Sequence, residues 1–136
     1  MICNLCPRRC GAERTPDKAG GVCAMPAWPV AARAMLHQWE EPCLVGERGA
    51  GAVFFSGCNL RCKFCQNGVI SQEGYGKPIT PRRLREVFEE LVEQGAACLD
   101  LVTPTHFTDA VLEALGEERW PVPVVWNCGG YESVET

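Results

Sequence analysis

The sequence lacks any apolar run approaching the roughly 18 residues that a transmembrane helix needs. Its first residues also lack the apolar segment and the small-residue cleavage pattern of a secretory signal peptide. Basic residues are not in excess, because the net charge is −4 and the isoelectric point is about 5.2. We therefore expect a cytoplasmic protein that binds neither membranes nor nucleic acid.

Cysteine, by contrast, is abundant, with ten among 136 residues. Such a density is typical of secreted disulfide scaffolds or of cytosolic metal proteins. Because the sequence carries no export signal, its thiols are expected to stay reduced. Metal binding is therefore the better interpretation, and no internal repeat or low-complexity stretch offers a different one.

The chain divides into two predicted parts. Residues 1–27 are rich in proline, glycine and cysteine, and a segment with so little core needs a metal to be ordered. Residues 28–136 alternate short apolar strands with amphipathic helices. This alternation predicts an α/β fold with a parallel sheet and right-handed crossovers.

Local signals place the individual elements. The predicted strands cover residues 30–37, 52–55, 98–102 and 123–126. Thr80 followed by Pro81 predicts the start of a helix that Gly95 ends, and Thr108 predicts the start of another that ends near Gly116. The last residues, 133–136, resemble the first turn of a third helix.

The predicted strands are too few to close a barrel. Three parallel strands leave one edge unpaired, and an unpaired edge is an association hazard. We therefore expect this sequence to be a fragment, a truncated gene product, or half of an assembly that another chain completes.

Cys58, Cys62 and Cys65 directly follow the strand predicted at 52–55, with the spacing C-x3-C-x2-C. Four thiolates saturate a four-iron cluster, whereas three leave one iron with an open coordination position for another ligand. Two alternatives remain. An electron carrier would need a fourth ligand on the same cluster, and a zinc-stapled interaction module would hold no cluster.

The run from Val53 to Asn67 resembles the cysteine loop of the radical S-adenosylmethionine (SAM) superfamily, and specifically the branch related to pyruvate formate-lyase activating enzyme. The cysteine-rich N-terminus and residues 101–106 and 127–132 are similar to an uncharacterised subgroup of that branch. The resemblance implies a partial β/α barrel in which the three central cysteines ligate a [4Fe–4S] cluster. It also implies an oxygen-sensitive enzyme that reductively cleaves SAM to a 5′-deoxyadenosyl radical for hydrogen abstraction.

The same resemblance implies which residues contact SAM. Backbone near Phe64 is expected to border the adenine, and Asn127 and Gly129 stand where relatives hold the cosubstrate. Thr103-Pro104-Thr105-His106 replaces the Gly-Gly-Glu of many relatives, and because proline has no amide hydrogen the contact must differ. His106 then either supplies a polar atom at the rim of the site or lies exposed in a turn.

A second group of cysteines lies at the N-terminus, at positions 3, 6, 10 and 23. Four thiolates complete either a tetrahedral zinc site or a saturated iron–sulfur cluster. The sequence leaves three possibilities open: structural zinc, an auxiliary cluster, and no metal.

The resemblance also implies partners. Reductive chemistry requires a low-potential electron donor such as flavodoxin or ferredoxin, and by analogy the substrate is a glycine α-carbon in a partner enzyme. The remaining cysteines are expected to matter less. Cys98 is predicted to be a small buried hydrophobe, Cys43 to lie in a loop, and Cys128 to border the SAM site.

Overall fold

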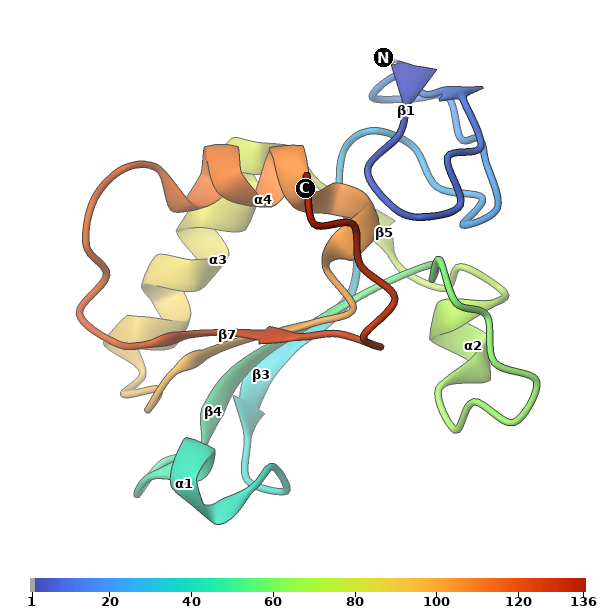
Figure 1. Ribbon diagram of the computed structural model, residues 1–136. Coiled ribbons are helices and arrows are strands. Elements are labelled where there is room, and N and C mark those ends of the chain that lie inside the picture. Colours follow the sequence, from blue (N-terminus) through green and yellow to red (C-terminus); the bar gives the residue numbers. More distant parts are fainter. Residues whose placement is uncertain (1) are drawn as a thin grey trace.

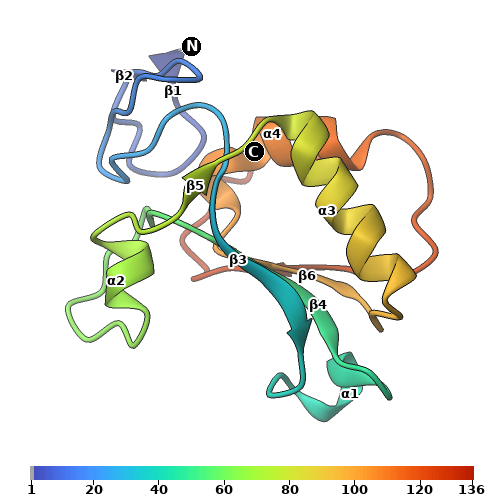
Figure 2. The same cartoon turned by 180° about the vertical axis from the view of Figure 1, so that it is seen from behind.

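A five-stranded mixed sheet with two helices on one face forms the centre of the structure, a computed structural model that describes residues 2–136. Across the sheet the order is β5-β3-β4-β6-β7. These strands are β3 (Val30–His37), β4 (Ala50–Phe55), β5 (Lys77–Pro78), β6 (Leu99–Val102) and β7 (Val124–Asn127). Figures 1 and 2 show α3 (Pro81–Glu93) and α4 (Thr108–Leu115) together on one face of the sheet.

The prediction of a parallel sheet is correct for three strands and wrong for the other two. β4, β6 and β7 are parallel, with Val53 paired to Leu101 and Leu101 to Trp126. β3 pairs antiparallel with both β4 and β5. Only the four-residue helix α1 (Pro42–Val45) lies between β3 and β4, and so short a helix does not make the usual parallel crossover.

Helix α3 forms where the sequence predicts it. The Thr80 side chain accepts a hydrogen bond of 3.0 Å from the backbone N–H of Arg83, and proline occupies the first helical position. Leu84, Phe88 and Leu91 are buried against the sheet. The opposite face carries exposed arginine–glutamate pairs, which is typical of a solvated helix surface.

Aromatic side chains make up much of the core between the helices and the sheet. Phe55 and Phe107 have ring centroids 5.9 Å apart, and both are almost completely buried. Phe88 meets Trp120 edge-on at 5.8 Å. Burial of each phenylalanine stabilises the fold by roughly 1.5–3 kcal/mol, so this cluster holds both helices on the sheet.

The N-terminal segment has little regular structure, as expected. β1 (Ile2–Cys3) and β2 (Ala12–Glu13) form a two-stranded hairpin, and a single bridge joins Gly20 to Met25. Figures 1 and 2 place this segment at the same end of the sheet as helix α2 (Gly68–Ser71). The predicted domain boundary at residue 27 falls in the loop before β3.

Two further expectations concern helices. Residues 133–136 form a turn, with the N–H of Thr136 donating to the carbonyl of Ser133, instead of the predicted start of a helix. Within residues 2–136, each helix is too short or too polar to cross a bilayer.

Candidate functional site

Residues 57–67, here called the cluster loop, leave the sheet at the carboxyl end of β4 and lead into α2 (Figure 1). Gly57 opens the loop with a φ of +76°, a conformation that suits glycine. A Cβ atom there would collide with the Met25 side chain and lie 2.9 Å from the carbonyl oxygen of Cys23. The backbone of the N-terminal segment therefore packs directly against the start of the cluster loop.

The three cysteines of the cluster loop are half-buried, and two of their sulfurs accept hydrogen bonds. The N–H of Leu60 lies 3.4 Å from Cys58 Sγ, and the hydroxyl of Ser71 lies 3.3 Å from Cys65 Sγ. Hydrogen bonds donated to sulfur orient the side chains of Cys58 and Cys65 within the loop. Three such sulfurs on one short loop are the donor set of an iron–sulfur cluster with one open iron.

The sulfur atoms of Cys58, Cys62 and Cys65 are not arranged as the ligands of a bound metal would be. Among residues 2–136, no three histidine, cysteine, aspartate or glutamate side chains already converge as metal ligands do. The fit of the cluster loop therefore depends on its donor chemistry and hydrogen bonds. Both suit a cluster.

Comparison with known proteins decides the family. The pattern of the radical SAM superfamily matches residues 52–120, which include β4, the cluster loop, α3 and α4. The chain belongs to the radical SAM superfamily. Membership implies a [4Fe–4S] cluster and SAM as cofactors, and the superfamily's general chemistry is the cleavage of SAM. This radical SAM protein is therefore expected to be an enzyme.

One curated relative of this radical SAM protein is an uncharacterized protein of Methanocaldococcus jannaschii, 30% identical over 142 aligned residues. The alignment covers 98% of the chain but 40% of the relative, so the chain spans about two fifths of that protein's length. No solved structure matches the chain.

One of the residues predicted to contact SAM, Gly129, lies beside the cluster loop of the radical SAM domain, whereas the Asn127 side chain interacts with Asp100 of β6. Asn127 ends β7, and Gly129 follows it so closely on Leu60 that an added Cβ would lie 3.1 Å from Leu60 Cδ2. The Asn59 side chain donates a hydrogen bond of 2.8 Å to the carbonyl oxygen of Tyr131. The segment after β7 and the cluster loop are thus held together.

Phe64, the third predicted contact, projects from the cluster loop with 91% of its surface exposed. Its aromatic face is therefore available to a ligand or a partner. A contact of Phe64, Asn127 or Gly129 with SAM remains a prediction.

His106 occupies a different position. It is buried in the 3₁₀ helix η1 (Thr105–Phe107), so the expectation of an exposed histidine is wrong. Its Nε2 lies 2.7 Å from the carbonyl oxygen of Ser56, and because a carbonyl only accepts, Nε2 carries the hydrogen. Nδ1 has no hydrogen-bond partner among the described residues. Burial lowers the pKa of His106 to about 4, so the ring is neutral at pH 7.

The N-terminal cysteines line one small cavity of about 10 Å³. All four line it, and so do Arg14, Asn59 and His106. Cys3, Cys6 and Cys23 are buried, and Cys10 lies at the surface. A backbone hydrogen bond from Ala12 lowers the pKa of Cys10, whereas burial raises that of Cys23.

Asp100 is a residue that the sequence interpretation missed. It lies in β6 and is completely buried, and its carboxyl oxygens make no hydrogen bond of normal geometry within residues 2–136, although the Asn127 side chain is close enough to lower its pKa. Burial, together with the negative charge of Glu40, raises the pKa of Asp100 to about 6. The sequence does contain a clue to its importance: Asp100 stands between Leu99 and Leu101, and a charged residue inside an apolar strand is uncommon.

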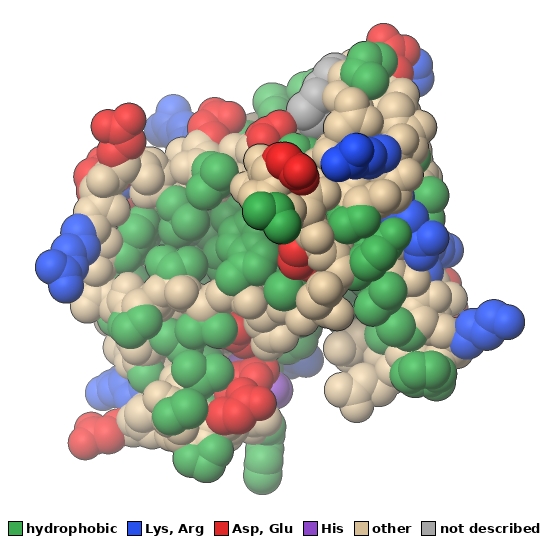
Figure 3. Space-filling model, viewed as in Figure 1, with side chains coloured by type: hydrophobic (Ala, Val, Ile, Leu, Met, Phe, Trp, Pro, Cys, Tyr) green, Lys and Arg blue, Asp and Glu red, His purple; other side chains and the backbone are tan. Residues whose placement is uncertain are grey.

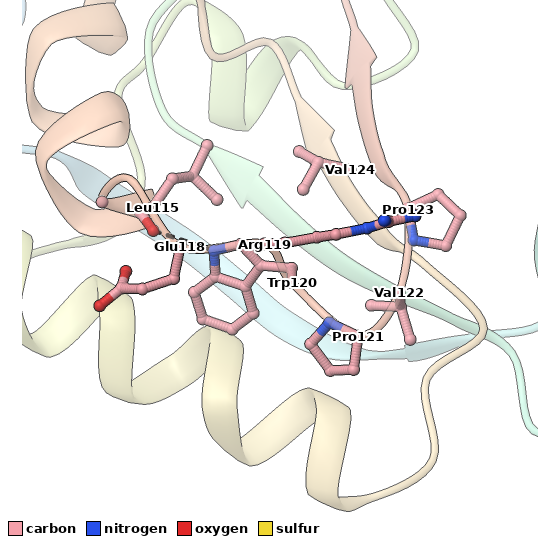
Figure 4. Close-up of a pocket in the computed structure, with 9 residues that line it drawn as sticks. Leu115, Glu118, Arg119, Trp120, Pro121, Val122, Pro123 and Val124 are labelled. Atoms are coloured by element: carbon pink, nitrogen blue, oxygen red, sulfur yellow. Dashed lines mark hydrogen bonds between the residues drawn. The ribbon is translucent and has the colours of Figure 1, made fainter.

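A large open cavity lies away from the cluster loop. It has a volume of about 690 Å³ and is formed by the loop between α4 and β7, including Trp120, Val122 and Val124. Figure 3 shows hydrophobic side chains gathered in a hollow at this place, and Figure 4 shows the residues that line it. No cysteine lines it, and we assign it no part in the chemistry.

The remaining cysteines are separate from both groups. Cys98 is buried, as predicted, and its sulfur lies 3.5 Å from the carbonyl oxygen of Leu44. Cys43 and Cys128 are exposed, and Cys128 directly follows Asn127 at the end of β7.

Proposed function

We propose that Cys58, Cys62 and Cys65 hold a [4Fe–4S] cluster whose fourth iron binds SAM. The observation that supports this most is the loop itself, which carries three half-buried thiols at the carboxyl end of a parallel strand. In such sheets ligands bind at the carboxyl ends of the strands. When bound, the cluster supplies an electron for cleavage of SAM to methionine and a 5′-deoxyadenosyl radical, which abstracts hydrogen from a substrate.

The residues of the chain position the cofactors and shield them. Ser71 and the backbone of Leu60 donate hydrogen bonds to the cysteine sulfurs. Gly129 stands beside the cluster loop, where an open backbone suits the polar groups of SAM, and Asn127 ends the strand β7 with an amide side chain that we expect to bind SAM. Phe64 offers its exposed ring and neighbouring backbone to the adenine.

The finer assignment is to the branch related to pyruvate formate-lyase activating enzyme. What supports it is the resemblance of the cluster loop, residues 101–106 and the N-terminal cysteines to that branch. On this proposal the substrate is a glycine α-carbon of a partner protein, which loses one hydrogen atom and becomes a glycyl radical. The electron comes from flavodoxin or ferredoxin, and the reaction takes place in the cytoplasm.

The fold proposal is a partial radical SAM barrel. β4, β6 and β7 supply three neighbouring parallel strands, and α3 and α4 cover them on one face, as a β/α barrel requires.

The experiment is anaerobic reconstitution with iron and sulfide, followed by electron paramagnetic resonance of the reduced protein. We expect a [4Fe–4S] spectrum that changes when SAM is added. Cys62→Ser should lose this spectrum, whereas Cys43→Ser, which changes an exposed cysteine outside both groups, should keep it. A cluster whose spectrum is unchanged by SAM would indicate an electron carrier. Zinc without a cluster would indicate an interaction module. Either result would refute the proposal.

A further inference from the structure

We propose that Cys3, Cys6, Cys10 and Cys23 bind one zinc ion, in a site separate from the cluster loop and supported by Arg14. Cys3 lies in β1, Cys6 and Cys10 lie in the loop between β1 and β2, and Cys23 lies in a later turn, yet all four line the same small cavity. Their side chains do not converge as zinc ligands do among residues 2–136, so a bound ion would have to bring them together. Four thiolates in tetrahedral arrangement are the usual ligand set of structural zinc.

The size of the cavity favours a single ion. Its volume of about 10 Å³ corresponds to roughly one water-sized atom. A four-iron cluster also contains four sulfides, so it needs much more space than one ion. We therefore propose zinc, and an auxiliary cluster at the same four cysteines is the outcome of the test that would contradict it.

Arg14 is built into the wall of this cavity. Its guanidinium is completely buried, and Nη1 donates to Cys3 Sγ over 3.2 Å. Nη2 donates to the carbonyl oxygens of Pro26 and, over 2.8 Å, His106. A zinc ion with four thiolates carries excess negative charge, and a buried cation that hydrogen bonds to one of the sulfurs offsets that charge.

The proposed zinc site also supports the cluster loop. Arg8, between Cys6 and Cys10, donates hydrogen bonds to the carbonyl oxygens of Asn59 at 2.9 Å and Leu60 at 3.3 Å. From the other side of the cavity, His106 bonds the carbonyl of Ser56, just before Gly57. A metal that orders the N-terminal segment would thereby fix both ends of residues 56–60.

The test uses a chain in which Cys58, Cys62 and Cys65 are all replaced by alanine, so that the radical cluster cannot contribute metal. We expect about one zinc per chain and no iron or sulfide. Adding Cys6→Ser should abolish zinc binding, whereas adding Cys43→Ser should leave it unchanged. Iron with sulfide in the triple variant, an absence of zinc, or zinc retained by Cys6→Ser would overturn the proposal.

A second measurement leaves the four N-terminal cysteines unchanged. Cobalt replaces zinc in the triple variant, and its absorption reports the number of sulfur ligands and their geometry. We expect the intense bands of a tetrahedral four-thiolate site, and weak octahedral bands would contradict it. Arg14→Lys should keep this spectrum but weaken zinc affinity about tenfold in competition with a chelator. An unchanged zinc affinity would show that Arg14 does not support the zinc site.

Discussion

The guanidinium of Arg8 donates a hydrogen bond of 2.9 Å to the carbonyl oxygen of Asn59, next to the first cysteine of the cluster loop. The same side chain lies over the ring of Tyr131, with 5.3 Å between Cζ and the ring centroid. One exposed arginine thus joins the N-terminal segment, the cluster loop and the segment after β7. The contacts of Arg8 with Asn59, Leu60 and Tyr131 therefore hold the cluster loop in place.

Arg8→Ala is therefore expected to loosen the cluster loop without unfolding the chain. Loss of hydrogen bonds to two carbonyls should raise the rate at which a chelator removes iron about fivefold. The measurement is the decay of cluster absorbance in the reconstituted protein. Arg9→Ala is the matched control, because among residues 2–136 the Arg9 side chain makes only an exposed ion pair of 3.9 Å with Glu135. Equal decay rates for the two variants would exclude this role for Arg8.

Gly57→Ala should disturb the same loop at its first residue. The positive φ alone costs a non-glycine residue roughly 1–2 kcal/mol, and the new methyl group would also collide with Met25. We expect a lower midpoint in thermal unfolding and less iron per chain after reconstitution. Gly68→Ala is the control, since nothing lies within 4 Å of a Cβ added there. Full iron content in Gly57→Ala would show that the loop tolerates displacement.

Asp100 should make stability depend on pH. Its folded pKa of about 6 lies above the ordinary value of 3.8, so the folded state holds the proton more tightly than the unfolded state. This stabilisation is complete below about pH 4 and is lost as the pH rises through 6. Relative to Asp100→Asn, the parent chain should lose about 2–3 kcal/mol of unfolding free energy across that range.

The measurement is urea unfolding of the parent chain and Asp100→Asn at several pH values between 4 and 7. The difference between the two chains is the quantity of interest, because other groups titrate in both. A difference that stays constant with pH would show that Asp100 has an ordinary pKa in the folded protein.

Local signals in the sequence were sufficient for α3 and β4. Thr80, Pro81 and the spacing of the buried leucines act within a few residues of one another, so they can be read without knowing the rest of the fold. The antiparallel pairing of β3 could not be predicted from such local signals. Its pairing with β5 joins segments far apart in the sequence, and a short apolar run does not specify its partner.

The candidate site shows the same division. The spacing of the central cysteines predicts that they act together as ligands, and the structure places all three on the cluster loop; their binding of a cluster stays a prediction. The burial of His106 was not predictable, because it depends on the N-terminal segment folding over η1, where Arg14 reaches a carbonyl 92 positions away. Asp100 was overlooked because the apolar residues around it dominate the pattern of the strand.

Coordination of SAM by the cluster is the central claim, and electron–nuclear double resonance tests it most directly. The reconstituted protein is reduced and mixed with SAM that carries nitrogen-15 in its amino group. We expect a hyperfine coupling between that nitrogen and the cluster, which requires direct bonding to the iron left open by Cys58, Cys62 and Cys65. A reduced [4Fe–4S] cluster without nitrogen-15 coupling would contradict the claim.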